Sequence, residues 1–249
     1  MIFSFLIFGH FYPTELFEVL APKSSVTASL DSSILLICRL SPPINAETME
    51  IRWIRNSFRP YVHLYINGGD EHKEQMEEFK GRTDFITQNI TRGSVALRIH
   101  KVQLSDQGSY TCYFESESHH SEAQVEIKAA AMGKNPFIVI EDYRNGRITL
   151  SCESSGWYPQ PMAMWREEFG KNLESAEETI SSGENGLFRV KTIIKIGTHS
   201  MVSCAVRNQG LNQEKENSIQ FAAQHVTDNK GLGIYLLQCK CLRTLKIVT

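Results

Sequence analysis

One stretch, Asp106-Gln107-Gly108-Ser109-Tyr110-Thr111-Cys112, restricts the fold of this chain more than any other. Upstream of it, Cys38 lies in an apolar run and Trp53 follows fifteen residues later. In an immunoglobulin sandwich one cystine joins the two sheets, a tryptophan packs against it, and a tyrosine stands two residues before the second cysteine. These offsets predict a sandwich crosslinked between Cys38 and Cys112, with Trp53 and Tyr110 in its core.

The same pattern occurs again downstream, where Cys152 is followed by Trp165 and Cys204. The second cysteine pair encloses 52 positions and the first 74, so only the first leaves room for the extra strands of a variable-type domain. A chance pairing of cysteines is disfavoured because the pattern is repeated. We therefore predict an all-β chain of two tandem immunoglobulin-like sandwiches, V-type then C-type, with a second disulfide between Cys152 and Cys204.

The predicted boundaries divide the 249 residues into five parts. Residues 1–14 resemble a secretory signal peptide, with a buried N-terminal strand as the alternative. Residues 15–128 form the V-type domain, 129–136 a linker and 137–222 the C-type domain. Residues 223–249 are expected to form a short tail without a full transmembrane helix, because its apolar run of seven residues is far below the roughly 20 that a bilayer requires.

Composition and cysteine usage narrow the compartment and the class of partner. The net charge is −2 and the pI is about 6.5, so nothing indicates binding to nucleic acid. Four cysteines at paired positions indicate an oxidising compartment. The two others, Cys239 and Cys241, could be palmitoylated, form a disulfide, or remain free thiols in a disordered tail, and we favour the last.

No motif in the sequence indicates catalysis, a cofactor or a metal, so an enzyme is not expected. The sequence has no Gly-rich phosphate loop, no nucleophile elbow and no C-x-x-C pair. His119 and His120 lie near three glutamates, but adjacent residues of a strand point to opposite faces and suit a shared ion poorly. We interpret both histidines as exposed recognition residues in the loop between strands F and G.

Other positions carry structural or covalent predictions. Arg82 and Asp106 are expected to form the ion pair common in variable-type domains. Asn89-Ile90-Thr91 is an acceptor for an N-linked glycan on Asn89. The Tyr158-Pro159 step lies at a tight turn and is a candidate cis peptide.

A variable-type domain can bind through its end loops or through the outward face of its G-F-C-C′ sheet. If Trp53 and Cys112 point inward, strict alternation turns Ile54 and Tyr113 outward. One of the two sets of alternate side chains of strand C′, most simply Tyr61, His63 and Tyr65, should point outward together with Ile54 and Tyr113. The alternative is that these are ordinary exposed residues. The candidate partner-binding residues are Arg52, Ile54, Tyr61, His63, Tyr65, Tyr113, Ser118, His119 and His120.

Four motifs of the chain resemble the butyrophilin family, including its butyrophilin-like and Skint members. They are Val62–Tyr65, Gln75–Thr83, Gly133–Pro136 and Cys152–Pro159. Asn208 stands four residues after the last paired cysteine, where antibody constant domains usually have histidine and butyrophilins have asparagine. The resemblance implies a type I cell-surface glycoprotein that regulates T cells, in part the γδ T cells of epithelia. Many members also carry a transmembrane helix and an intracellular SPRY domain, which this sequence does not include.

The predicted function is recognition at the cell surface or as a secreted protein. By resemblance, the chain binds a receptor on T cells and modulates their selection or activation, alone or as a homo- or heterodimer with related members. It contacts a membrane only through an anchoring segment that this sequence does not include. The alternative function is homophilic adhesion or scaffolding.

Overall fold

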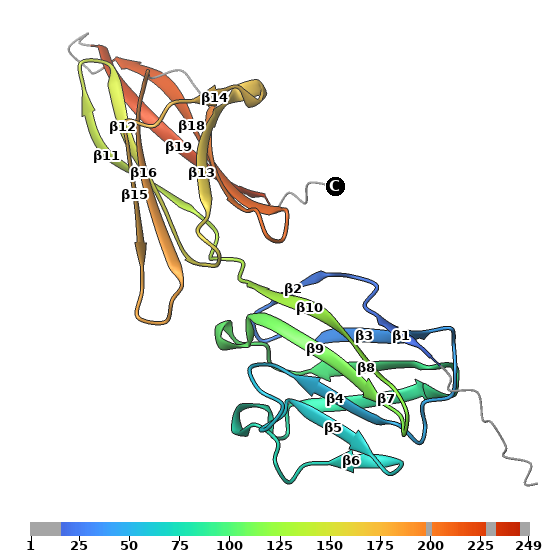
Figure 1. Ribbon diagram of the computed structural model, residues 1–249. Helices are drawn as coiled ribbons and strands as arrows, with labels where there is room; N and C mark the ends of the chain where they lie inside the picture. Colours follow the sequence, from blue (N-terminus) through green and yellow to red (C-terminus); the bar gives the residue numbers. More distant parts are fainter. Residues whose placement is uncertain (1–15, 198–200, 228–232, 245–249) are drawn as a thin grey trace, which may run out of the picture. The chain divides into compact units, whose positions relative to one another are not determined.

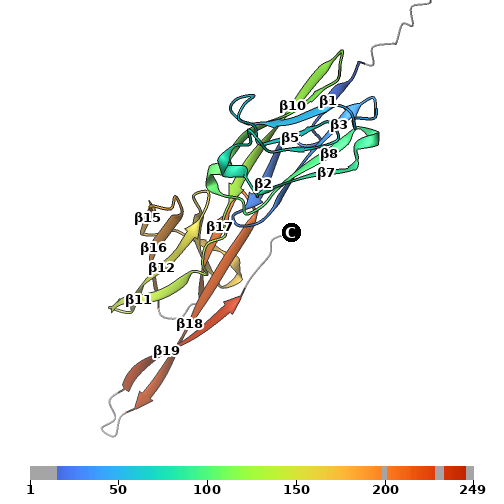
Figure 2. The ribbon, with the colours of Figure 1, turned by 90° about the horizontal axis from the view of Figure 1, so that it is seen from below.

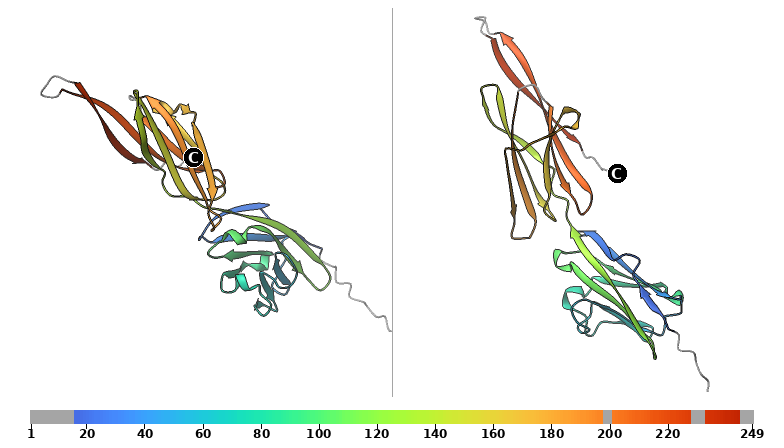
Figure 3. Two further views of the ribbon diagram at one scale, coloured as in Figure 1. Left: turned by 90° about the vertical axis from the view of Figure 1, so that its left-hand side faces the viewer. Right: turned by 45° about the horizontal axis from the view of Figure 1, so that its top comes forward.

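The computed structural model describes residues 16–197, 201–227 and 233–244, and the chain forms two compact units of β-strands (Figure 1). The first unit takes in most of residues 16–127, and the second begins at Lys128. Each unit has two sheets, which two further views show as two layers (Figure 3). The predicted all-β architecture of two sandwiches is confirmed.

The first unit pairs a four-stranded sheet with a six-stranded one. The strand orders are β1-β3-β8-β7 and β2-β10-β9-β4-β5-β6. The bounds of these strands are β1 Glu18–Leu20, β2 Ser25–Ser29, β3 Ile34–Ser41, β4 Glu50–Ile54, β5 His63–Ile66, β6 Gly69–Glu71, β7 Thr83–Asn89, β8 Ser94–Ile99, β9 Gly108–Glu115 and β10 His120–Ala130. Three short 3-10 helices connect them: η1 Glu77–Phe79, η2 Ile90–Arg92 and η3 Leu104–Asp106.

The core of the first unit follows from alternation along its strands. Every second residue of β3 is buried, and β9 shows the same period at its inward positions. Because successive side chains of a strand point to opposite faces, the two strands face each other across the sandwich. Their buried side chains are Ile34, Leu36, Cys38 and Leu40 from β3, and Tyr110, Cys112 and Phe114 from β9.

The structure corrects one of the two disulfide predictions. Cys38 and Cys112 lie in opposite sheets and are fully buried beside Trp53, as predicted, but they are separate thiols. Burial, followed by hydrogen bonding to Cys38, raises the pKa of the Cys112 thiol well above its usual value.

The second unit has a four-stranded and a five-stranded sheet, ordered β11-β12-β16-β15 and β14-β13-β17-β18-β19. The strands are β11 Phe137–Arg144, β12 Arg147–Trp157, β13 Met162–Glu167, β14 Asn172–Leu173, β15 Glu177–Ser182, β16 Phe188–Gly197, β17 Met201–Asn208, β18 Gln213–Thr227 and β19 Gly233–Thr244, and the 3-10 helix η4 is Glu168–Gly170. Cys152 of β12 and Cys204 of β17 form a disulfide between the sheets, and the buried Trp165 pairs with Cys204. The Tyr158-Pro159 bond is cis, as predicted.

Two of the predicted connecting or terminal segments contain regular structure. Within the predicted linker, β10 continues to Ala130, and Ala131 exchanges backbone hydrogen bonds with Tyr158 inside the second unit (2.7 and 3.1 Å). Instead of an unstructured tail after residue 222, β18 and β19 form a long antiparallel hairpin (Figure 2). The side chains of Cys239 and Cys241 and all of residues 1–15 lie outside the described part of the structure, so the predictions made for them stay predictions. No helix in the described part of the chain has the length and apolar character needed to span a bilayer.

Candidate functional site

The outward face of the six-stranded sheet is set by the register of its central strands. Trp53 pairs with Cys112 on the inward face, and the next residues along, Arg52 with Tyr113 and Ile54 with Thr111, pair on the outward face. This is the arrangement that strict alternation predicted for Ile54 and Tyr113, both of which are partly exposed.

Arg52 lies at the centre of this face and is buried by its neighbours, with 2% of its surface exposed. Its Nε donates to Glu50 Oε1 at 3.0 Å, its Nη2 forms an ion pair with the same carboxylate, and its Nη1 donates to the Phe58 carbonyl at 3.1 Å. The Phe58 ring lies 4.0 Å from the guanidinium and the Tyr61 ring 5.3 Å. A guanidinium that loses its water is retained only when it is paired and hydrogen bonded, as here.

Tyr113 joins this group and presents it to solvent. Its ring packs edge-on against Phe58 at 5.3 Å and stacks on the exposed His120 at 5.7 Å. Its hydroxyl donates to Glu115 Oε2 at 3.2 Å, and burial, then the Glu115 charge, raise the pKa of the phenol. We call Glu50, Arg52, Phe58, Tyr61 and Tyr113 the Arg52 cluster. Because Glu50, Glu115 and Glu122 surround Tyr113 through the strand pairing, the cluster has an acidic rim.

Strand C′ of the prediction corresponds to β5, and the prediction of which of its side chains point outward was wrong. His63 and Tyr65 are buried and point inward, where both rings lie against Phe85 of β7, at 5.5 and 5.2 Å. The side chains turned outward from β5 are Leu64, which pairs with Arg52, and Ile66. Tyr61 precedes β5 and reaches the outward face, but it is buried beneath Arg52 and accepts a hydrogen bond from the Glu74 N–H through its hydroxyl.

Phe58 was missed by the sequence analysis, although it is the most exposed aromatic ring of the Arg52 cluster, at 45%. It lies in the polar connection between β4 and β5, Arg55-Asn56-Ser57-Phe58-Arg59-Pro60. A lone aromatic residue in a connection of that composition was the available signal, but single exposed apolar residues are common on protein surfaces, so it did not distinguish Phe58.

The other candidate residues lie in or beside the loop between β9 and β10, and they differ in exposure. Ser118 and His120 are exposed, as predicted. His119 is half-buried and was wrongly predicted to be exposed, since its ring packs edge-on against Phe17 at 4.8 Å and Nε2 lies 2.8 Å from the Phe17 carbonyl oxygen. The loop also borders a polar hollow with the connection between β3 and β4, lined by Ile44, Asn45, Thr48, Met49, Ser116, Glu117 and Ser118.

Comparison with known proteins shows which family models and relatives the chain matches. The family model "Immunoglobulin V-set domain" matches residues 21–129, and "Butyrophilin subfamily 3 member A2-like, Ig-C domain" matches residues 132–216. Butyrophilin subfamily 2 member A2 of Homo sapiens is 40% identical over 82% of this chain and 39% of its own length, and butyrophilin subfamily 1 member A1 of Bos taurus is 39% identical over 83% and 40%. The chain thus spans about two fifths of these relatives.

A crystal structure of bovine butyrophilin superposes with a TM-score of 0.76 at 39% identity, covering 83% of this chain and 99% of that one. The chain belongs to the butyrophilin family. A chain in a crystal structure of ICOS with ICOS-L and an anti-ICOS-L VNAR domain shares the fold, with a TM-score of 0.62 at 19% identity. The protein is therefore a butyrophilin-type immunoglobulin-superfamily ectodomain, and immunoglobulin-fold proteins of this kind are not enzymes.

Two of the butyrophilin motifs meet around the buried His63. Gln75 donates through Nε2 to the Val62 carbonyl at 2.9 Å and to Thr83 Oγ1 at 2.8 Å, and Thr83 Oγ1 lies 3.0 Å from His63 Nδ1. His63 Nε2 lies 3.2 Å from Asp70 Oδ1 but is poorly aligned for a hydrogen bond. Val62–Tyr65 and Gln75–Thr83 thus hold the C′ edge of this butyrophilin sheet against β7.

The other two butyrophilin motifs meet at the start of the second unit. Gly133 lies directly on the ring of the buried Trp157, whose Nε1 donates to Ser154 Oγ at 2.8 Å. The buried Asn208 donates through Nδ2 to the carbonyls of Ala131 and Tyr158, at 2.8 and 2.6 Å. The asparagine that marks the family therefore ties the segment before β11 to the turn after β12.

The remaining predicted residues are Arg82, Asp106 and Asn89. Arg82 donates to the carbonyls of His100 and Lys101 at 3.1 and 3.0 Å, and the buried Asp106 accepts from the Gln103 N–H at 2.9 Å. Their mutual ion pair stays a prediction. Asn89 is exposed at the end of β7, where a glycan would meet no buried surface, and its occupancy also stays a prediction.

The environment of His63 predicts a pH-dependent stability. Burial lowers the pKa of His63 below its usual 6.5, while the charges of Asp70 and Asp84 oppose the shift and His72 adds to it. Above pH 6.5 the ring is neutral in both states. As the pH falls below 6.5, the unfolded chain binds the proton more readily, so stability should decrease by up to about 1.4 kcal/mol per pH unit until the folded-state pKa is passed.

Urea unfolding between pH 7.5 and 5 would measure this dependence. His63→Gln should be less stable than the wild type at pH 7.5 but should lose less stability on acidification. His120→Gln, a variant at an exposed histidine of the same unit, should keep the wild-type slope. Equal slopes for His63→Gln and the wild type would contradict the assignment.

Proposed function

We propose that this butyrophilin-type ectodomain binds a protein receptor on T cells through the Arg52 cluster and modulates T-cell selection or activation. The support is a solvent-facing group of aromatic rings around a desolvated arginine, since tyrosine and arginine in such settings are the usual energetic centres of protein interfaces. We also propose that the protein acts outside the cell, at the surface or after secretion, with a glycan on Asn89.

The acidic rim supports a partner of complementary charge. Glu50, Glu115 and Glu122 lie beside Tyr113, so a receptor with basic residues around an apolar centre fits this face better than a second copy of it does. The same like-charge argument disfavours homophilic adhesion through the Arg52 cluster. Association should therefore weaken as ionic strength rises.

Replacing Tyr113 by aspartate should remove the exposed ring and add a negative charge beside Glu50, Glu115 and Glu122. Binding of tetramers of the ectodomain to T cells should fall by about tenfold or more, as for a central interface residue. The matched control is Tyr143→Asp, which alters a 50% exposed tyrosine on β11 of the second unit.

Equal binding by the Tyr113→Asp and wild-type tetramers, with both variants folded, would contradict binding through the Arg52 cluster. The hollow beside Ser118 would then be the candidate binding site. Sedimentation of the wild type at micromolar concentration separates the two functions. A monomer would exclude homophilic adhesion, and a dimer that Tyr113→Asp dissolves would replace the receptor proposal.

A further inference from the structure

Between β1 and β2, from Leu20 to Ser25, the chain passes from one sheet of the first unit to the other. This change leaves part of β3 without a neighbouring strand on one side. Before the change, β1 pairs with β3 over Arg39–Ser41 only. After the change, β2 runs beside β10 in the other sheet. Residues Ile34–Cys38 of β3 are thus paired with β8 on one side, and no described strand pairs with their other side.

The register identifies which backbone groups face this open edge. The Leu40 N–H donates to the Gly93 carbonyl at 2.8 Å, which directs the backbone of Leu40 toward β8. In an antiparallel ladder this direction alternates, so Cys38 and Leu36 also face β8, whereas Leu35 and Ile37 direct their N–H and C=O groups to the open edge. The side chains of Leu35 and Ile37 are 40% and 42% exposed.

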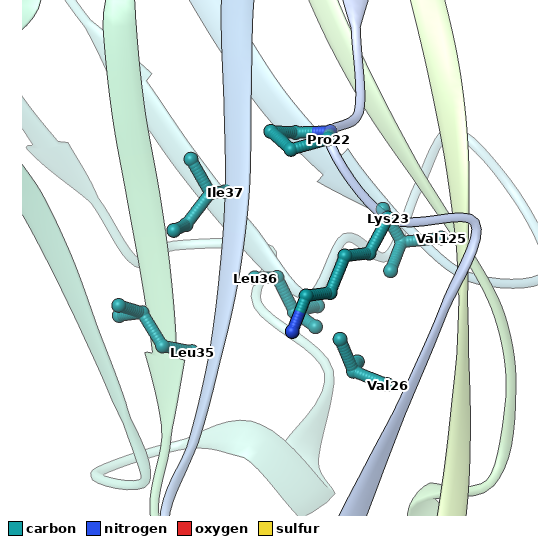
Figure 4. Close-up of a pocket in the computed structure, with 7 residues that line it drawn as sticks. All are labelled: Pro22, Lys23, Val26, Leu35, Leu36, Ile37 and Val125. Atoms are coloured by element: carbon teal, nitrogen blue, oxygen red, sulfur yellow. The ribbon is translucent and has the colours of Figure 1, made fainter.

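An apolar cavity of about 140 Å³ lies beside the open edge (Figure 4). Leu36, Val26 and Val125 surround it, and Lys23 extends across it from the segment before β2. A dry cavity of roughly 150 Å³ can hold one benzene ring. The pocket is therefore the size of one apolar side chain, with an ammonium group beside it.

We propose that this edge binds an extended peptide segment of another protein as an added β-strand. The partner strand would take the free N–H and C=O groups of Leu35 and Ile37, which gives affinity independent of its sequence. One apolar side chain would enter the cavity, and an aspartate or glutamate two positions along the added strand, on the same face, would meet Lys23, for which the described residues show no carboxylate partner. This site lies on the sheet change and is separate from the Arg52 cluster.

The charge of Lys23 decides the chemistry of the occupant. A sheet edge and an apolar hollow alone would accept many segments, but a lysine over the opening favours an acidic residue two positions from the apolar anchor, on the same face of the strand. A second copy of the chain, or residues 1–15 of the same chain, are the competing occupants, and the experiment distinguishes them.

The test uses the full chain and a labelled, acetylated peptide of sequence threonine-valine-threonine-leucine-threonine-aspartate-threonine. Fluorescence anisotropy should show saturable binding, and the backbone amide signals of Leu35 and Ile37 should shift in NMR spectra. Lys23→Glu should weaken binding by about fivefold or more and should instead favour the same peptide with lysine in place of aspartate. Lys195→Glu, a charge reversal at an exposed residue of β16, should leave both affinities unchanged.

Three results would overturn the proposal. One is the absence of saturable binding by the peptide, and another is equal affinity of the wild type and Lys23→Glu for both peptides. The third is occupation of the site by the chain itself, shown by self-association that Lys23→Glu abolishes or by peptide binding that appears only after residues 1–15 are removed.

Discussion

Replacing Gly133 by alanine should lower the free energy of unfolding of the second unit by about 3 kcal/mol or more. A Cβ at this position would lie 2.2 Å from Trp157 Nε1 and 2.4 Å from two ring carbons. The indole cannot move aside, because it is fully buried and its Nε1 is hydrogen bonded to Ser154. Either the ring or the backbone of Gly133 must shift, and the Lys215 hydrogen bond to the Gly133 carbonyl (2.6 Å) would be strained with it.

Hydrogen-exchange mass spectrometry in urea measures this effect, because each unit is reported by its own peptides. Gly197→Ala is the matched control, since a Cβ there meets nothing within 4 Å and Gly197 needs no left-handed backbone. It should change stability by less than about 0.5 kcal/mol. A Gly133→Ala variant with the wild-type midpoint would show that the glycine is not required by the tryptophan.

The second large effect is expected on removal of the Cys152–Cys204 disulfide. The bond closes a loop of 52 residues between the two sheets. In the chain-entropy model a loop of that length contributes about 4 kcal/mol at 25 °C. The double variant Cys152→Ala, Cys204→Ala should therefore lose about 2–5 kcal/mol in the second unit, and the first unit should keep its stability.

Reductant provides the internal control for this experiment. It should bring the second unit of the wild type down to the stability of the double variant and leave the variant itself unchanged. A double variant as stable as the wild type would contradict the prediction. The first unit should not respond, because Cys38 and Cys112 are thiols. A response there would show instead that this pair is crosslinked in solution.

The positions that follow strict strand alternation could be predicted from the sequence. Ile54 and Tyr113 turned outward as expected, because β4 and β9 pair without a register shift and their inward residues are fixed by Trp53 and Cys112. The family motifs could also be located in the sequence. Their physical roles could not, since Gly133 and Trp157 are distant in sequence and meet only in the fold.

Alternation alone could not show which side chains of strand C′ (β5) face the core, because both sets of alternate residues include apolar or aromatic side chains. Phe85 of β7 settles the choice by stacking on His63 and packing on Tyr65, and the sequence gives no indication of which strand C′ will face. Phe58 was missed for a related reason. Its importance comes from Arg52, which is buried only because a loop residue folds back over it.

The burial of Arg52 has a consequence for the speed and selectivity of association. Long arginine side chains on a protein surface normally occupy many rotamers, and freezing them opposes complex formation. Here the two rings and the Glu50 carboxylate immobilise the guanidinium in the free protein. An incoming receptor would therefore meet a surface whose shape is already fixed. The arginine could not rearrange to accommodate a partner of poorly matching shape.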